Sequence, residues 1–269
     1  MAAPILAIDL DGTLLDGTDI PADNADALRE AVSRDYTVVI ATARWHQMAA
    51  SLLDQMGIDG YVIACNGAHI CKPSEALDLL DLRIEVDLAN AIMERARAFG
   101  GLMTATLEDS VVVYSESKET RVLPDYILSV QGFPAFEGVG PRMMSYQGGT
   151  AFDPAFENGA SPLRSIEQLK ASLTVDDSIG PSGQPVTIIS AREATKGRSL
   201  RVLCDYLSRS PEEVIAFGDS EGDLDLFATA GTSVAMGQAP ERVKKAADFV
   251  TLSNVEAGVG AFLRKAWSL

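Results

Sequence analysis

Two aspartates stand one residue apart near the start of the chain, in the string ILAIDLDGT. A turn alone would account for Asp11 and Gly12, because Asp-Gly is a common turn dipeptide. Asp9 is different, because it falls inside the apolar run of residues 5–10, where a carboxylate without a partner would be costly to bury. The pair therefore indicates acid chemistry at the end of a buried strand.

A second pair of acids, Asp219 and Asp223, closes the string AFGDSEGD. If the two pairs converge, their carboxylates repel one another and stay partly protonated unless a cation holds them. Mg²⁺ suits a site made of a few carboxylates and a substrate phosphate, because it is a hard cation that prefers oxygen ligands. The four acids thus predict a Mg²⁺ site.

The elements that must position these acids follow from the hydrophobic pattern. Apolar runs predict strands over residues 5–10, 36–43 and 60–68, and amphipathic stretches predict helices over residues 22–35 and 45–57. The strand runs are continuously apolar, as in a parallel sheet that is buried on both faces. Ligands bind such sheets beyond the carboxyl ends of the strands, which is where the acids lie.

The alternation breaks at about residue 82 and returns at about residue 192. The stretch between them mixes helices with antiparallel-type strands, which we predict over residues 88–100, 109–117, 162–173 and 185–190. We therefore predict an α/β fold in two parts. A catalytic core of residues 1–82 and 192–269 carries an inserted α+β unit, residues 83–191.

Composition excludes several classes of partner. The 269 residues carry a formal charge of -16, which argues against nucleic-acid binding because that needs a basic patch. No apolar run reaches the about 18 residues of a membrane span, and no secretory signal precedes the first strand. Three cysteines without a CxxC motif make a disulfide framework improbable, so we expect a cytoplasmic protein.

Several motifs together resemble those of the haloacid dehalogenase (HAD) superfamily. They are DLDGTLL at the first strand end, ATAR at the second, CNGA at the third, TKG after the insertion, and AFGDSEGDLDLF followed by VAMGQAPERVKKAADFVT. More narrowly, the chain resembles the Cof-type, class IIB phosphatases. The resemblance implies a Rossmann-like parallel-sheet core, a C2-type cap that selects the substrate, and Mg²⁺-dependent hydrolysis of small phosphomonoesters such as sugar phosphates.

The resemblance also implies roles for the acids. Asp9 would be the nucleophile that forms an aspartyl-phosphate. Asp11 would protonate the leaving alkoxide and then activate water, and we expect it on the side of Asp9 because residues i and i+2 of an extended segment share a face. Mg²⁺ would be held by Asp9, the backbone carbonyl of Asp11 and Asp219, with Asp223 in support.

The implied phosphate contacts come from the first two strand ends and from the TKG motif. They are Thr42, the backbone amides of Leu10 and Ala43, and Lys196, which supplies positive charge that the acidic chain lacks. Thr42 also fits a plain strand end, because threonine favours strands. We expect Arg44 to pair with a carboxylate of the core.

Three positions depart from the pattern of the resembled branch. Ala43 replaces the glycine of ATGR, which is tolerable unless the turn needs a positive φ. Gln238 stands in place of an asparagine. Gly222 stands where GDxxND has asparagine, so we expect the phosphate contact of that side chain to be lost or supplied differently.

Other polar residues have structural interpretations beside functional ones. Asn66 fits both a supporting residue of the site and a turn residue. We interpret His46 and His69 as structural or surface groups, because their spacing is not that of metal ligands. Cys65 and Cys71 are predicted to be small core residues.

Alternative functions remain open beside the phosphatase. One is a phosphomutase, or a pathway-specific sugar-phosphate phosphatase, of the same superfamily; the other is a non-catalytic sensor of a phosphorylated ligand. The pair Asp9 and Asp11 argues against the sensor, because a binding protein needs neither a nucleophile nor an acid/base. The expected partner is a small phosphorylated metabolite, and the sequence leaves its identity and the oligomeric state open.

Overall fold

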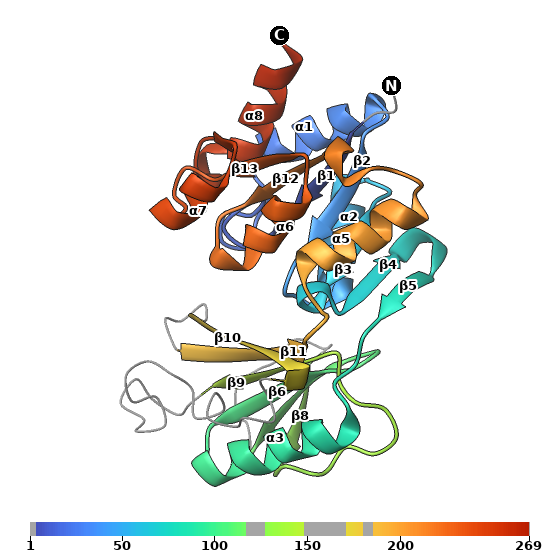
Figure 1. Ribbon diagram of the computed structural model, residues 1–269, viewed down its shortest axis with the longest axis vertical. Helices are drawn as coiled ribbons and strands as arrows, with labels where there is room; N and C mark the ends of the chain where they lie inside the picture. Colours follow the sequence, from blue (N-terminus) through green and yellow to red (C-terminus); the bar gives the residue numbers. More distant parts are fainter. Residues whose placement is uncertain (1–3, 117–126, 148–170, 180–184, 269) are drawn as a thin grey trace. The chain divides into compact units, whose positions relative to one another are not determined.

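The computed structural model describes residues 4–116, 127–147, 171–179 and 185–268, and the chain forms two compact units (Figure 1). The core unit comprises Met1–Leu80 and Thr195–Leu269, and the inserted unit comprises Asp81–Ala194. Most of the helix predicted over residues 162–173 lies outside the described residues. Among the described helices, none is both long and apolar enough to cross a membrane.

A sheet of eight strands forms the centre of the core unit, in the order β14-β13-β12-β1-β2-β3-β4-β5. The strands are β1 (Ile5–Ile8), β2 (Thr37–Ala41), β3 (Tyr61–Ala64), β4 (His69–Lys72), β5 (Leu77–Asp81), β12 (Val214–Gly218), β13 (Thr232–Ala235) and β14 (Phe249–Val250). Pairing is parallel from β14 through β3, and β4 runs antiparallel to β3. The sheet is therefore parallel where β1, β2 and β12 meet, as the sequence predicts.

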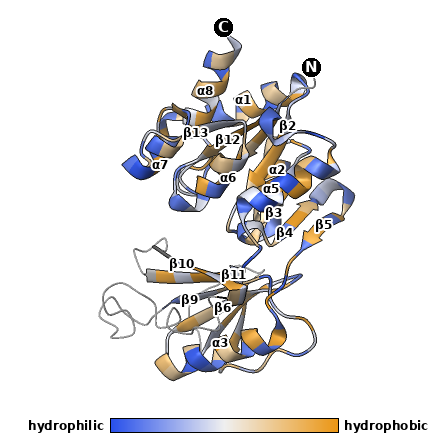
Figure 2. Cartoon of the chain, in the orientation of Figure 1, coloured by the Kyte–Doolittle hydropathy of each residue, from blue (hydrophilic) through white to orange (hydrophobic). Residues whose placement is uncertain are grey.

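Helices flank this sheet because its strands are apolar on both faces. Ile5 and Ala7 of β1 share a buried cluster with Leu200 and Leu203 of α5, so the alternate residues of β1 face the opposite side. Figure 2 shows the hydrophobic colouring of the sheet against the hydrophilic α7. The helices are α1 (Ala22–Ser33), α2 (His46–Met56), α5 (Lys196–Tyr206), α6 (Leu224–Thr229), α7 (Glu241–Ala246) and α8 (Gly258–Trp267).

Short 3-10 turns complete the core unit. They are η1 (Cys65–Gly67), η2 (Pro73–Glu75), η5 (Pro211–Glu213), η6 (Glu221–Asp223) and η7 (Asn254–Glu256). The turn η2 joins β4 to β5, two strands that the sequence analysis did not anticipate. Their residues are only partly apolar, and Pro73 interrupts them, so the hydrophobic pattern gives no strand signal there.

The inserted unit has its own sheet and its own hydrophobic core. Its strands are β6 (Leu102–Thr106), β7 (Val111–Ser115), β8 (Ile127–Gln131), β9 (Met143–Gln147), β10 (Leu173–Ile179) and β11 (Pro185–Ala191), in the order β10-β11-β9-β6-β7-β8. Among the described strands of this unit, all pairs are antiparallel except β7 with β8. Helix α3 (Val86–Phe99) lies along this sheet and packs Ile92 and Met93 against Met103 and Met144 (Figure 1).

Candidate active site

Asp9 is the first residue after β1, and the sheet still aligns it. Its amide donates to the carbonyl of Phe217 in β12 at 3.1 Å, and its side chain is buried, with the residue 6% exposed. A carboxylate so deeply buried needs a partner. That partner is Lys196, whose Nζ lies 2.6 Å from Asp9 Oδ1.

Lys196 bridges two acids at the start of α5. Its Nζ also lies 2.7 Å from Asp223 Oδ1, and the lysine is 4% exposed. The helix start is fixed on both sides of it, because the hydroxyl of Thr195 accepts from the amide of Arg198 at 3.2 Å and the amide of Gly197 donates to the Asp225 carboxylate at 2.8 Å. The Lys196 ammonium is therefore buried at the end of β1, and the fixed start of α5 holds it there.

Asp223 organises the loop that follows β12. It is fully buried, and its Oδ2 accepts from the amides of Asp219 at 3.1 Å and Ser220 at 3.0 Å, and from the Ser220 hydroxyl at 3.0 Å. With Oδ1 on Lys196, both of its oxygens are engaged. Asp223 therefore positions Asp219 and the lysine.

Asp219 is the third acid of this cluster, and its side chain is hydrogen-bonded to Thr13. The Thr13 hydroxyl donates to its Oδ1 at 3.3 Å. Gly12 has φ +80°, and a Cβ at that position would overlap the Asp219 carboxylate, so both the turn and the close approach require glycine. Burial, with a contribution from Asp223, raises the pKa of Asp219 to about 6.

The charges of this cluster do not balance. Asp9, Asp219 and Asp223 each offer a carboxylate oxygen, and these atoms lie within 4.8 Å of one another, while Lys196 brings one positive charge. Burial raises the pKa of Asp9 to about 8 against the opposing ammonium. Burial disfavours the charged form of Lys196, but Asp223 and Asp9 raise its pKa well above its usual value. The three carboxylates offer only oxygen ligands and carry more negative charge than Lys196 neutralises, which suits a hard divalent cation such as Mg²⁺.

Asp11 lies in a different environment from Asp9. It is exposed, and Arg44 holds it through two contacts, Nε to Oδ2 at 2.8 Å and Nη2 to Oδ1. The two acids are not residues of one strand, because β1 ends at Ile8 and the chain turns at Leu10, whose carbonyl accepts from the amide of Thr13. That their side chains face the same side stays a prediction. The expected carboxylate partner of Arg44 is thus Asp11.

The loop after β2 carries the next predicted residues. Thr42 is fully buried; its amide donates to the carbonyl of Ile63 at 2.8 Å, and its hydroxyl accepts from the amide of Arg44 at 3.0 Å. The hydroxyl therefore shapes the turn that presents Arg44. Ala43 is not among the described residues with a positive φ, so alanine is tolerated where the related branch has glycine.

Asn66 stands in the turn η1, which connects two parts of the site. Asn66 has φ +58°, and its amide donates to the carbonyl of Thr42 at 3.0 Å. Gly67 lies so close to the backbone of Thr195 that a Cβ there would overlap it. The turn thus links the end of β2 to the start of α5. Its geometry accounts for the turn role of Asn66, and a role toward the ligand stays a prediction.

Gly222 and Gln238 are two of the positions at which the sequence departs from the pattern of the resembled branch. Gly222 is exposed and outside the left-handed region, and a Cβ there would meet only the Ser220 hydroxyl, at 3.4 Å. Gln238 donates from Nε2 to the carbonyl of Gly12 and accepts from the amide of Asn254 at 3.2 Å. Gln238 therefore braces the loop after β1, a role that no sequence signal indicated because its partner lies 226 positions away.

Comparisons with known proteins agree with this arrangement. The sequence model of the haloacid dehalogenase-like hydrolases matches residues 6–263. Phosphatase YwpJ of Bacillus subtilis is 28% identical, over 97% of this chain and 98% of its own. The 5-amino-6-(5-phospho-D-ribitylamino)uracil phosphatase YwtE of the same organism is 27% identical, over 96% of both chains.

A solved structure extends the likeness to the fold. The HAD subclass IIB sugar phosphatase BT4131 superposes with a TM-score of 0.78 at 22% identity, covering 99% of this chain and 100% of its own. The likeness confirms the predicted α/β fold class, and the named relatives confirm the resemblance that the motifs indicate.

Proposed function

Because the chain belongs to the haloacid dehalogenase-like hydrolases, whose relatives include phosphatases, we propose that it hydrolyses small phosphomonoesters, sugar phosphates among them, through an aspartyl-phosphate on Asp9. The observation that carries the proposal is the buried contact of Lys196 with Asp9 and Asp223. Burial raises the pKa of Asp9, and the positive charges of Lys196 and of a bound cation would oppose that rise and favour the carboxylate form that a nucleophile for phosphorus requires.

In the first step, a carboxylate oxygen of Asp9 bonds to phosphorus and the ester oxygen of the substrate leaves. Lys196 contacts Oδ1 of Asp9, so its charge also lies beside an incoming phosphoryl group. Thr42 and the backbone amides of Leu10 and Ala43 complete the proposed phosphoryl contacts. Such fixed donors stabilise charge that develops on the phosphoryl oxygens in the transition state.

Proton transfer is assigned to Asp11. It gives a proton to the leaving alkoxide, then takes one from the water that attacks the phosphoenzyme, which releases inorganic phosphate and restores Asp9. In the present arrangement Arg44 engages both oxygens of Asp11. At least one of these contacts must open before Asp11 can donate a proton, so Arg44 is a positioning residue in this mechanism.

Mg²⁺ is the proposed cofactor, held by Asp9, Asp219 and the backbone carbonyl of Asp11. When bound it supplies positive charge to the phosphoryl oxygens. Asp223 supports the site through the amide of Asp219. The three carboxylates with one lysine fit such a cation, since one ammonium cannot neutralise them.

The inserted unit is proposed to select the substrate. It folds around its own hydrophobic core, so it can offer residues for contact with the substrate that are separate from those of the core unit.

The cysteines bear on the proposed cytoplasmic setting. Cys65, Cys71 and Cys204 form no disulfide, which supports that setting.

The proposal is tested with the purified protein, a panel of phosphomonoesters and Mg²⁺, with phosphate release as the readout. We expect hydrolysis of at least one sugar phosphate, loss of it with a chelator, and recovery with added Mg²⁺. No release from any ester, together with saturable binding of a phosphorylated sugar, would instead identify a sensor.

A further inference from the structure

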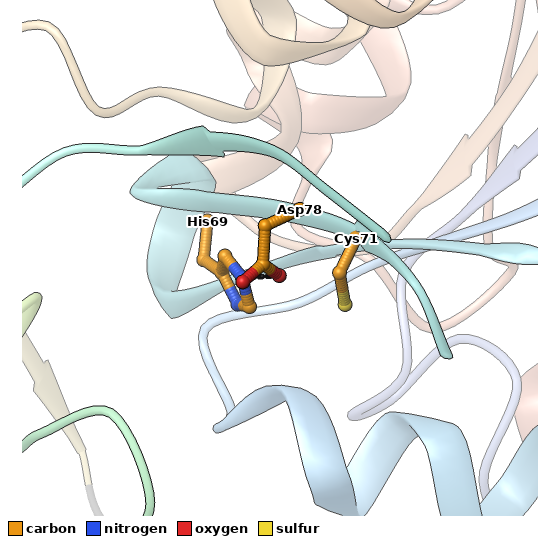
Figure 3. A group of neighbouring side chains, drawn as sticks. All are labelled: His69, Cys71 and Asp78. Atoms are coloured by element: carbon orange, nitrogen blue, oxygen red, sulfur yellow. Dashed lines mark hydrogen bonds and ion pairs between the residues drawn. The ribbon is translucent and has the colours of Figure 1, made fainter. Parts of the chain in front are cut away.

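The last two strands of the core sheet, β4 and the edge strand β5, bring together three side chains that the phosphatase mechanism does not use. His69 and Cys71 occupy alternate positions of β4, so they point to the same face, and Asp78 stands in the neighbouring strand β5. Figure 3 shows that all three side chains project to the same side of these strands. We call them the His69 cluster.

The geometry of the His69 cluster is compact. His69 Nε2 lies 2.6 Å from Asp78 Oδ1, and one nitrogen, one sulfur and one oxygen of the three residues lie within 4.8 Å of one another. His69 and Cys71 are buried, whereas the Asp78 side chain is 58% exposed. Two residues of the cluster, Cys71 and Asp78, line a cavity of about 310 Å³. A ligand can therefore reach the cluster from the side of Asp78.

We propose that His69, Cys71 and Asp78 bind a single borderline-soft divalent cation, with Zn²⁺ as the best match. Imidazole nitrogen, thiolate sulfur and carboxylate oxygen are the three donor types that Zn²⁺ takes in proteins. Bond lengths of about 2.0 to 2.3 Å in a tetrahedral site put neighbouring ligand atoms about 3.3 to 3.7 Å apart. The three ligand atoms lie within 4.8 Å of one another, so a shift of about 1 to 1.5 Å at most is needed, and the exposed Asp78 can supply it by moving away from its 2.6 Å contact with His69.

A second imidazole borders the cluster. His46 lines the same cavity, and its ring lies edge-on to that of His69, with centroids 4.8 Å apart. His46 is not among the residues whose ligand atoms lie within 4.8 Å of one another, so water would supply the fourth ligand.

The two cation clusters of the core unit differ in chemistry. Asp9, Asp219 and Asp223 offer oxygen only, which suits Mg²⁺. The His69 cluster includes a sulfur, which Mg²⁺ avoids and Zn²⁺ accepts. The expectation that His69 has no metal partner is incomplete, because Asp78 lies nine positions away on a strand that the hydrophobic pattern did not predict.

The test uses Co²⁺ as a spectroscopic substitute for Zn²⁺, added to the metal-free full chain in excess Mg²⁺. We expect a thiolate-to-cobalt charge-transfer band that saturates at one equivalent and disappears when Zn²⁺ displaces the cobalt. Cys71→Ser should abolish the band, whereas Cys204→Ser, which alters an equally buried cysteine of α5, should retain it. Asp78→Asn should weaken cobalt binding by about tenfold or more.

A control separates the two clusters. Asp219→Asn, which removes an oxygen ligand of the catalytic cluster, should keep the band and its stoichiometry. The proposal is overturned if the unaltered chain gives no band, if Cys71→Ser binds Zn²⁺ as tightly as the unaltered chain in calorimetry, or if Asp219→Asn loses the band. Circular dichroism of each variant verifies that the fold is retained.

Discussion

The core unit and the inserted unit bury charge for different purposes. In the core unit, Lys196, Asp9 and Asp223 meet at the ends of parallel strands, and their charges do not cancel. In the inserted unit, Arg142 is buried against Asp81 through Nε at 2.8 Å and Nη2 at 3.1 Å, and Arg83 also contacts that aspartate. The first arrangement leaves charge for a ligand. The charges of the second balance, because Glu108 lies 3.7 Å from Arg83 and gives two carboxylates for two guanidinium groups.

This difference follows from the two sheets. Parallel strands end together at one edge, so the residues that follow β1, β2 and β12 converge there, because β1 pairs in parallel with both of the other strands. The sheet of the inserted unit is mostly antiparallel, so successive strand ends alternate between edges. For this reason the proposed catalytic residues lie in the core unit.

Replacing the nucleophile gives the largest effect that we expect. Asp9→Asn should lower kcat by at least on the order of 10⁴, because the covalent route is lost. Asp16→Asn, in the same loop but exposed, should be near the unaltered rate. Phosphate release measures both, and circular dichroism checks the fold. More than a trace of turnover in the Asp9 variant would contradict covalent catalysis there.

Asp11→Asn should have the next largest effect, about 10² to 10⁴ in rate on a sugar phosphate. A substrate with a very good leaving group needs little acid help, so phosphoenzyme formation on an aryl phosphate should fall much less. Single-turnover kinetics on the two substrates gives the comparison. Equal losses on both would exclude Asp11 as the acid.

The buried ion pair of Arg142 with Asp81 predicts an effect on the stability of the fold. Arg142→Ala should cost about 3 kcal/mol in the free energy of unfolding, because it removes a buried partner of Asp81. Arg97→Ala breaks an exposed pair with Glu116 and should cost under about 1 kcal/mol. Urea denaturation measures both. Equal costs would show that burial of Arg142 is not what stabilises the pair.

Removal of the inserted unit tests its proposed role in selectivity. Joining Leu80 to Thr195 through a short linker deletes the second unit at its boundaries. Discrimination among sugar phosphates should fall by about 10 to 200-fold in relative kcat/KM, while hydrolysis of a small aryl phosphate is retained. A deletion variant that folds and still discriminates fully would assign selectivity to the core unit.

The smallest predicted effect concerns Gly222. Gly222→Asn should raise kcat/KM by about tenfold, since a hydrogen bond to a charged group contributes about 1.5 to 3 kcal/mol. The position has room for a side chain and no positive φ. Gly222→Ala is the matched control, because it adds a Cβ without a hydrogen bond. An unchanged or lower kcat/KM for the asparagine variant would mean that another group makes the contact.

The sequence by itself determined the local properties of the chain. Continuous apolar runs predicted β1, β2 and β3, amphipathic runs predicted α1 and α2, and the motifs indicated the family, because burial and periodicity are local. The strands β4, β5, β6, β8, β9 and β10 escaped prediction, because their sequences are mixed or polar and their pairing partners define them.

Only the tertiary structure decided which side chains meet. Lys196 contacts Asp9 across 187 positions of sequence, Arg44 contacts Asp11 across 33 positions, and His69 meets Asp78 across the neighbouring strands β4 and β5. These partnerships depend on strand order and on where each turn places its side chains. Residue spacing does not contain that information, because the same acids and bases are compatible with many pairings until the sheet brings particular strand ends together.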